Sequence, residues 1–177
     1  MTEILKIKQV KVPRWDDLPD FGIYKDQLVT IVKEVCDPFY ITDEDFITPS
    51  MVNNYVKLNR MPTPKKKKYY REHIASIIVI TVLKQIISLD DISKGIELER
   101  DVYEYKQAYN MFCNVLEKSI NRVFNSNEKL LFDNSKKDYE TSIELITIAL
   151  CMKLYTQIIL KYNGIEGVKY GQDCNTN

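Results

Sequence analysis

The fold is decided by residues 48–71, which read TPSMVNNYVKLNRMPTPKKKKYYR. The opening Thr-Pro-Ser predicts the start of a helix, because threonine can cap a helix and proline is pre-organised at its first position. This helix is expected to run to about Asn59, because Pro62 and Pro64 prevent further helix. The rest of the stretch, to Tyr70, predicts a loop or a short hairpin with a basic tip.

The predicted helix has an apolar face and a polar face when residues are placed about 100° apart. The apolar face carries Met51, Val52, Tyr55, Val56 and Leu58. The polar face carries Ser50, Asn53, Asn54 and Lys57. The spacing therefore predicts a helix that buries one side and presents short polar side chains on the other.

On the N-terminal side, a helix is expected over residues 25–36, where apolar residues recur at helical spacing. Asp37-Pro38 should end it, because the residue before a proline avoids the helical region. A short helical turn is expected over residues 42–46. The first 24 residues look irregular, with Trp15 and Phe21 expected to anchor them on the core.

On the C-terminal side, residues 71–87 predict a very apolar, buried helix, and Ser88 is placed to cap a short helix after it. A long helix should follow from about Val102 to Val123, and another over residues 139–162. The residues between these two helices look turn-like. The chain is therefore expected to be mainly α, with four segments: an N-terminal arm (1–24), a winged helix-turn-helix domain (25–97), a helical-hairpin domain for dimerisation or signal input (98–164) and a flexible tail (165–177).

The charge of the chain is balanced overall but uneven along the sequence. Lysine and arginine together number 25, as do aspartate and glutamate, so the formal net charge is zero. Basic residues nevertheless crowd residues 57–71, where Glu72 is the only nearby acid. Because the local field decides where a polyanion docks, this stretch outweighs the neutral total.

Together these features favour a DNA-binding surface. Major-groove reading uses a helix that presents short polar side chains, and asparagine can donate to and accept from adenine at once. Lysines in a hairpin would neutralise phosphates without sequence preference. The predicted DNA-contacting residues are Ser50, Asn53 and Asn54 for bases, and Lys57, Arg60, Lys65, Lys66, Lys67, Lys68, Tyr69 and Arg71 for phosphates. Tyr69 or Tyr70 could instead pack beneath the hairpin.

Each feature alone has a simpler interpretation. An amphipathic helix is usually an ordinary surface helix, and consecutive lysines are usually a solvated loop. The combination of a capped helix, a proline-stiffened turn, a basic hairpin and a buried helix is more specific. Two other uses of the same fold stay open: a protein-interaction module whose lysines dock an acidic partner, and a small-molecule sensor without DNA binding.

The same residues carry a family resemblance. The runs TPSMVNNY (48–55), KLNRMPTP (57–64), KKKKYYREHI (65–74) and LKQIISLDDI (83–92) resemble the winged helix-turn-helix of MerR-type regulators. They resemble still more closely a bacterial family of unknown function whose members carry T-x-x-M-x-N-N-Y-V-K, a K-K-K-Y wing and L-K-Q-x-x-S-L. The MerR-like part covers residues 48–96, and the second resemblance covers roughly residues 20–100.

The MerR resemblance implies binding to double-stranded DNA as a homodimer and a role in transcription. This sequence departs from the MerR pattern at Asn54, Asn59 and Arg60. The fold stays plausible, since asparagine tolerates the left-handed conformation that a turn glycine serves. No effector motif is recognisable after residue 100, so any small-molecule effector is unknown.

Catalytic activity and binding of a metal or a cofactor are not expected. The sequence has no phosphate-binding glycine loop, dinucleotide fingerprint or zinc-protease motif, so we expect no enzyme, cofactor or metal. His73 is expected to be a partly buried capping or surface residue. The widely spaced cysteines indicate free thiols in a cytoplasmic protein, and no signal peptide or membrane span is expected. Tyrosines 103, 105, 109, 139, 155 and 162 fit either the core or a small-molecule pocket between the long helices.

Overall fold

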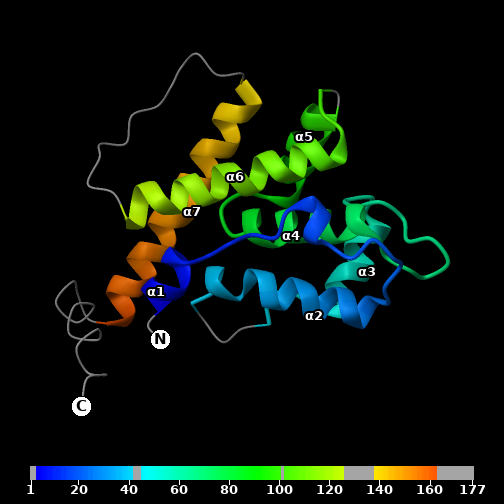
Figure 1. Ribbon diagram of the computed structural model, residues 1–177, viewed down its shortest axis with the longest axis horizontal. Helices are drawn as coiled ribbons and strands as arrows, with labels where there is room; N and C mark the ends of the chain where they lie inside the picture. Colours follow the sequence, from blue (N-terminus) through cyan, green and yellow to red (C-terminus); the bar gives the residue numbers. More distant parts are fainter. Residues whose placement is uncertain (1–2, 42–44, 101, 126–137, 163–177) are drawn as a thin grey trace.

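The computed structural model describes residues 3–41, 45–100, 102–125 and 138–162 and is mainly helical (Figure 1). Its helices and 3-10 turns are α1 (Glu3–Lys8), η1 (Trp15–Asp17), α2 (Lys25–Cys36), η2 (Asp37–Phe39), α3 (Pro49–Lys57), α4 (Arg71–Leu83), α5 (Leu89–Arg100), α6 (Tyr105–Phe124) and α7 (Asp138–Lys161). The mainly α class is confirmed. No β-strand longer than an isolated bridge occurs among the described residues.

The helix boundaries agree best with the sequence where local signals are strong. The predicted helices over residues 25–36 and 139–162 correspond to α2 and α7. The backbone N–H of Met51 donates to Thr48 Oγ1 at 3.2 Å, so Thr48 caps α3 as predicted. Ser88 Oγ likewise accepts from the Asp91 N–H at 3.1 Å at the start of α5. The long helix predicted from Val102 begins later, at Tyr105, and Val102 is exposed.

Replacing Thr48 by alanine should destabilise the protein by about 1 kcal/mol, because the N–H of Met51 loses its acceptor. Urea unfolding followed by circular dichroism measures this change. Ser50→Ala is the matched control, because Ser50 is exposed one residue inside the same helix. Equal stability of the two variants would show that the Thr48 cap contributes nothing.

The N-terminal arm differs from its prediction. Residues 3–8 form helix α1, which buries Ile4 and Ile7. A helix this short is not stable alone, so no local signal announces it. Tertiary contacts hold it, including the ion pair of Glu3 with Lys161 at 2.6 Å. Trp15 packs against the core as expected, but Phe21 is 64% exposed, so its predicted anchoring role is wrong.

The described residues do not form a winged helix-turn-helix. Residues 37–48 separate α2 from α3, whereas a helix-turn-helix joins its helices by a turn of about 3–4 residues. The predicted wing is reduced to a single bridge between Lys65 and Lys68. Pro62 and Pro64 lack the N–H groups that a longer ladder would need. The predicted turn over residues 42–46 lies mostly outside the described residues, and residues 45 and 46 are not helical.

One hydrophobic core joins the helices. Helix α4 is buried along most of its length. It ends at Leu83, before the predicted end at Ile87. The core includes side chains from α1, α2, α4, α6 and α7, such as Ile7, Leu28, Ile77, Leu116 and Leu154. Side chains from both predicted domains therefore contribute to one core. The division of the chain into a domain over residues 25–97 and another over residues 98–164 stays a prediction.

Helix α7 is long and apolar. By length and composition alone, Glu140–Lys161 could cross a membrane, with a mean hydropathy of 1.7. Core helices of soluble proteins meet the same criterion, so this is weak evidence for a membrane. In this fold 33% of the apolar window is buried, and Leu150, Leu154 and Ile158 are fully buried in the core.

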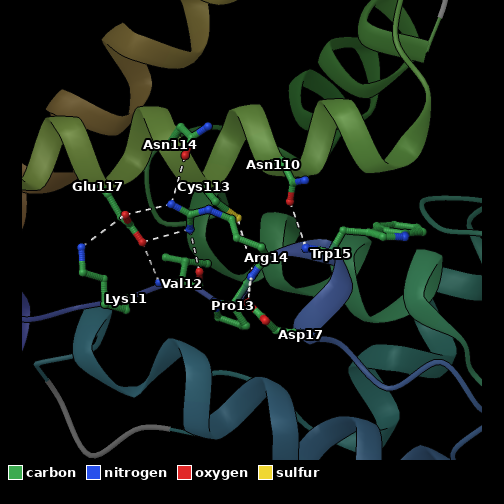
Figure 2. A network of polar contacts seen from close by, with 10 residues as sticks. All are labelled: Lys11, Val12, Pro13, Arg14, Trp15, Asp17, Asn110, Cys113, Asn114 and Glu117. Atoms are coloured by element: carbon green, nitrogen blue, oxygen red, sulfur yellow. Dashed lines mark hydrogen bonds and ion pairs between the residues drawn. The ribbon is translucent and has the colours of Figure 1, made fainter.

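The arm lies along α6 through a polar network (Figure 2). The Glu117 carboxylate accepts from Arg14 Nη1 and Nη2 at 3.0 and 2.9 Å, and from the Val12 N–H at 3.0 Å. Asn110 Oδ1 accepts from the Trp15 N–H at 2.9 Å. These bonds fix residues 12–15, and through them the chain that leads into α2.

Candidate nucleic-acid interface

The exposed face of α3 carries the predicted polar side chains. Ser50, Asn53, Asn54 and Lys57 are exposed, while Val52 and Tyr55 are buried. Leu58 departs from the predicted apolar face, since it is 48% exposed at the C-terminal cap. The helix therefore presents a short polar surface backed by the core.

Asn59 ends α3 in the way glycine usually does. Its φ is 54°, in the left-handed region. The Arg60 N–H donates to Tyr55 O at 2.8 Å, and the Asn59 N–H donates to Val56 O at 3.1 Å. This pair of bonds is the Schellman motif. The prediction that asparagine could replace the turn glycine is confirmed.

The lysine hairpin, residues 65–68, closes in a two-residue turn. Lys65 and Lys68 exchange backbone hydrogen bonds of 3.1 and 2.9 Å. Lys66 and Lys67 have φ values of 51° and 62°. Hairpin turns with two positive φ values favour Asn-Gly, because side chains such as lysine are strained there. The chain therefore keeps two lysines at the tip at a conformational cost, which is a feature of functional sites.

Residues 22–24, which precede α2, pack against the lysine hairpin. Ile23 and Tyr69 exchange backbone bonds of 2.9 Å each. Lys68 Nζ lies 5.6 Å from the centre of the Tyr24 ring, and Lys65 Nζ lies 6.0 Å from that of Tyr70. At Gly22 any Cβ would come within 2.9 Å of both Lys68 and Tyr70 side-chain atoms. A larger residue at this position would require the Lys68 and Tyr70 side chains to shift.

Lys25 connects the hairpin to the face of α3. It follows Tyr24 directly, and its Nζ donates to Asn53 Oδ1 at 3.1 Å. Tyr24 and Lys25 thus bring the two predicted parts of the site together on one surface. The sequence analysis missed Lys25, because only the tertiary packing of α2 places it there. We call this surface the basic face. It consists of Lys25, Ser50, Asn53, Asn54, Lys57 and Lys65–Lys68.

The basic face carries uncompensated positive charge. Among the described residues, Lys25, Lys57 and Lys65–Lys68 form no ion pair with an acidic side chain, whereas Lys33 is paired with Asp45 at 2.6 Å. A cluster of unpaired lysines raises the local potential even in a neutral protein. The face is therefore suited to a polyanion.

Three predicted contact residues make internal contacts instead. Arg60 forms an ion pair with Asp90 of α5. Arg71 Nε donates to Leu18 O at 2.9 Å and so holds the arm. Tyr69 is 5% exposed and packs edge-on against His73, which is the packing role beneath the hairpin. None of these side chains is free to hold a phosphate in this arrangement.

His73 fixes the proline turn to α4. It caps the helix as predicted, because its Nδ1 accepts from the Tyr70 N–H at 3.0 Å. Its Nε2 lies 3.3 Å from Thr63 O. The ring is fully buried rather than partly exposed. His73 is thus a structural residue that sets the base of the hairpin.

The described cysteines are structural. Cys36, Cys113 and Cys151 are free and buried. Burial raises the pKa of Cys113 to about 11 and that of Cys151 to about 12, so both stay protonated thiols. Cys174 lies outside the described residues. Within the described ranges, no group of three or more His, Cys, Asp or Glu side chains is arranged to hold a metal.

Comparison with known proteins places this chain in a family. No curated protein and no solved structure matches it. A family model described as "Domain of unknown function (DUF1836)" matches residues 13–112. The matched residues include the second half of the arm from residue 13, the basic face and α4 and α5. Because the match covers more than half of the chain, this protein belongs to the DUF1836 family of domains of unknown function.

Proposed function

We propose that this protein binds double-stranded DNA sequence-specifically through the basic face and acts in transcriptional regulation. The observation that carries the proposal is the link from Lys68 through Tyr24 and Lys25 to Asn53. This link joins a helix face that can read bases to a hairpin that can hold phosphates. Both kinds of contact are needed, because phosphates position a protein and bases give specificity.

The α3 face is assigned to the major groove. A helix fits this groove, and side chains in its first turns meet base edges. Ser50 and Asn53 are exposed in those turns. A bidentate contact of Asn53 with adenine requires release of the Lys25 bond, which leaves the Lys25 ammonium free to meet a phosphate. Lys57 lies one turn further on and is assigned to the backbone.

The proposal includes a homodimer, because a two-fold protein matches two half-sites. Helix α7 offers a surface for it. Leu145, Met152 and Leu160 are 44%, 51% and 72% exposed, and their spacing puts them on one stripe. Large exposed apolar patches mark association surfaces.

Asn53→Ala should weaken binding to a preferred DNA site by about tenfold, as expected for loss of one base contact. Binding to random duplex should stay within about twofold, since the lysines are unchanged. Fluorescence anisotropy with both DNAs measures the two effects. The matched control is Asn121→Ala, an exposed asparagine on α6. Equal losses for both DNAs would refute base reading by Asn53.

The proposed function is tested by the salt dependence of DNA binding. Labelled random duplex is titrated with the full chain from low to physiological salt. We expect affinity to fall steeply, with a logarithmic slope of about −4 or steeper if Lys25, Lys57 and the hairpin lysines neutralise phosphates. Absence of binding at low salt would overturn the proposal.

A protein-interaction module is the second candidate. Phe21 and Tyr24 are 64% and 61% exposed beside the lysine hairpin. Exposed aromatic side chains are enriched at protein interfaces, and lysines would favour an acidic partner. If the protein is such a module and does not bind DNA, the salt series should detect no complex with DNA.

A further inference from the structure

A pocket lies between α4, α5, α6 and α7, away from the basic face. Its volume is about 330 Å³, within the range of small-molecule sites. Its walls are mostly apolar, with Val79 and Leu83 from α4, Ile92 from α5, Phe112 from α6, and Ile143 and Ile146 from α7. Tyr103, Tyr105 and Tyr109 also line it, so the pocket alternative for these tyrosines has a structural basis.

Gly95 lines this pocket and is exposed to solvent. It lies in the interior of α5, where glycine is the poorest helix former after proline. A Cβ added there would meet no atom within 4 Å, so packing does not require glycine. Asp91, Gly95 and Leu98 fall on one stripe of α5, and all three line the pocket. A larger residue at Gly95 would extend into the open space.

Several polar groups of the walls are engaged within the protein, whereas the buried Tyr109 hydroxyl has no hydrogen-bond partner among the described residues and Lys94 forms no ion pair there. Ser76 Oγ donates to Glu72 O at 2.6 Å, and Tyr103 Oη donates to Glu140 Oε1 at 3.1 Å. Asp91 accepts from Ser88 Oγ at 2.7 Å. A charged ligand would lose most of its hydration against walls that are mainly apolar. An apolar ligand would gain by leaving water.

We propose that this pocket binds an uncharged, predominantly apolar small molecule. The shape favours a small molecule over a protein surface, because the walls come from four helices and form a concave site that is open on one side. Protein–protein interfaces are broader and flatter than such a site. The proposal stands independently of DNA binding.

The uncharged fluorescent probe N-phenyl-1-naphthylamine tests the site in the full chain. Trp15 is the only tryptophan, and its ring centre lies 6.4 Å from that of Tyr105 and 6.5 Å from that of Tyr109. Both tyrosines line the pocket, so a bound probe should quench Trp15 emission by energy transfer. We expect saturable binding of one probe per chain with matching quenching.

Gly95→Leu should fill the pocket and weaken probe binding by at least about tenfold. Gly95→Ala is the matched control, and it should stay within about twofold because a single methyl leaves most of the space. Both variants should melt no lower than the wild type, since each replaces a helical glycine. Val79→Phe fills the pocket from the opposite wall and should also weaken binding. Failure of the wild type to bind, or unchanged affinity in both filled variants, would overturn the proposal.

Discussion

Replacing Lys66 by asparagine and Lys67 by glycine lowers the affinity for duplex DNA by about 60-fold in 0.1 M salt, if both lysines neutralise phosphates. Each phosphate contact adds about 0.9 to the logarithmic salt slope, so the slope should decrease by about 2. The same change should stabilise the fold, because Asn-Gly is the preferred pair for a turn with two positive φ values. Anisotropy and thermal melting measure the two effects.

This variant separates binding from folding. A loss of affinity in a protein that melts higher cannot come from unfolding. Lys8→Gln with Lys118→Gln is the matched control, since both lysines are exposed on other helices and the net charge change is the same. If control and hairpin variants lose affinity equally, the effect is one of total charge and the hairpin has no special role.

Replacing Glu117 by alanine destabilises the protein by about 2 kcal/mol at neutral pH. The Glu117 side chain is only 17% exposed, and its loss leaves the Val12 N–H without its acceptor and the Arg14 guanidinium with only Val12 O and Asn114 Oδ1 as acceptors. Arg14 is 32% exposed, so water compensates part of the loss and the cost falls below that of a fully buried pair. Urea unfolding measures the change, with Glu34→Ala, on the exposed side of α2, as control.

The effect of Glu117 should depend on pH. Burial raises the pKa of Glu117, but hydrogen bonds from Arg14 and Val12 and the charge of Arg14 outweigh it and hold the pKa below its usual 4.5. The contribution is therefore fully present above pH 4.5 and is lost as pH falls through the lowered pKa. The pKa of Glu3 is also lowered, to about 2, so the difference between wild type and variant isolates the contribution of Glu117. A difference that stays constant down to pH 2 would contradict this account.

Features set by neighbouring residues could be predicted from the sequence. The cap at Thr48, the end of α3 at Asn59 and the extent of α2 each depend on a few adjacent side chains and backbone groups. The two faces of α3 follow from its periodicity. Most residues of the candidate site could therefore be predicted from the sequence alone.

Features that depend on tertiary packing could not be predicted. Lys25 joins the basic face because the start of α2 packs beside α3, and Arg60 leaves it because Asp90 of α5 lies within reach. The sequence predicts a short hairpin with a basic tip for this stretch, but not the two positive φ values of Lys66 and Lys67, because lysine does not favour them. The MerR-type pattern suggested a winged helix-turn-helix, whereas the observed α2–α3 connection and the single bridge differ from one.

The central claim, that the basic face binds DNA, is tested most directly by mapping backbone amide shifts of the isotope-labelled protein during titration with a DNA site selected from genomic fragments. The account predicts that the largest shifts fall in residues 49–57 and 65–68 and at Lys25, with little change in the long helices α6 and α7. Saturating DNA that shifts no resonance, or shifts confined to α6 and α7, would contradict it.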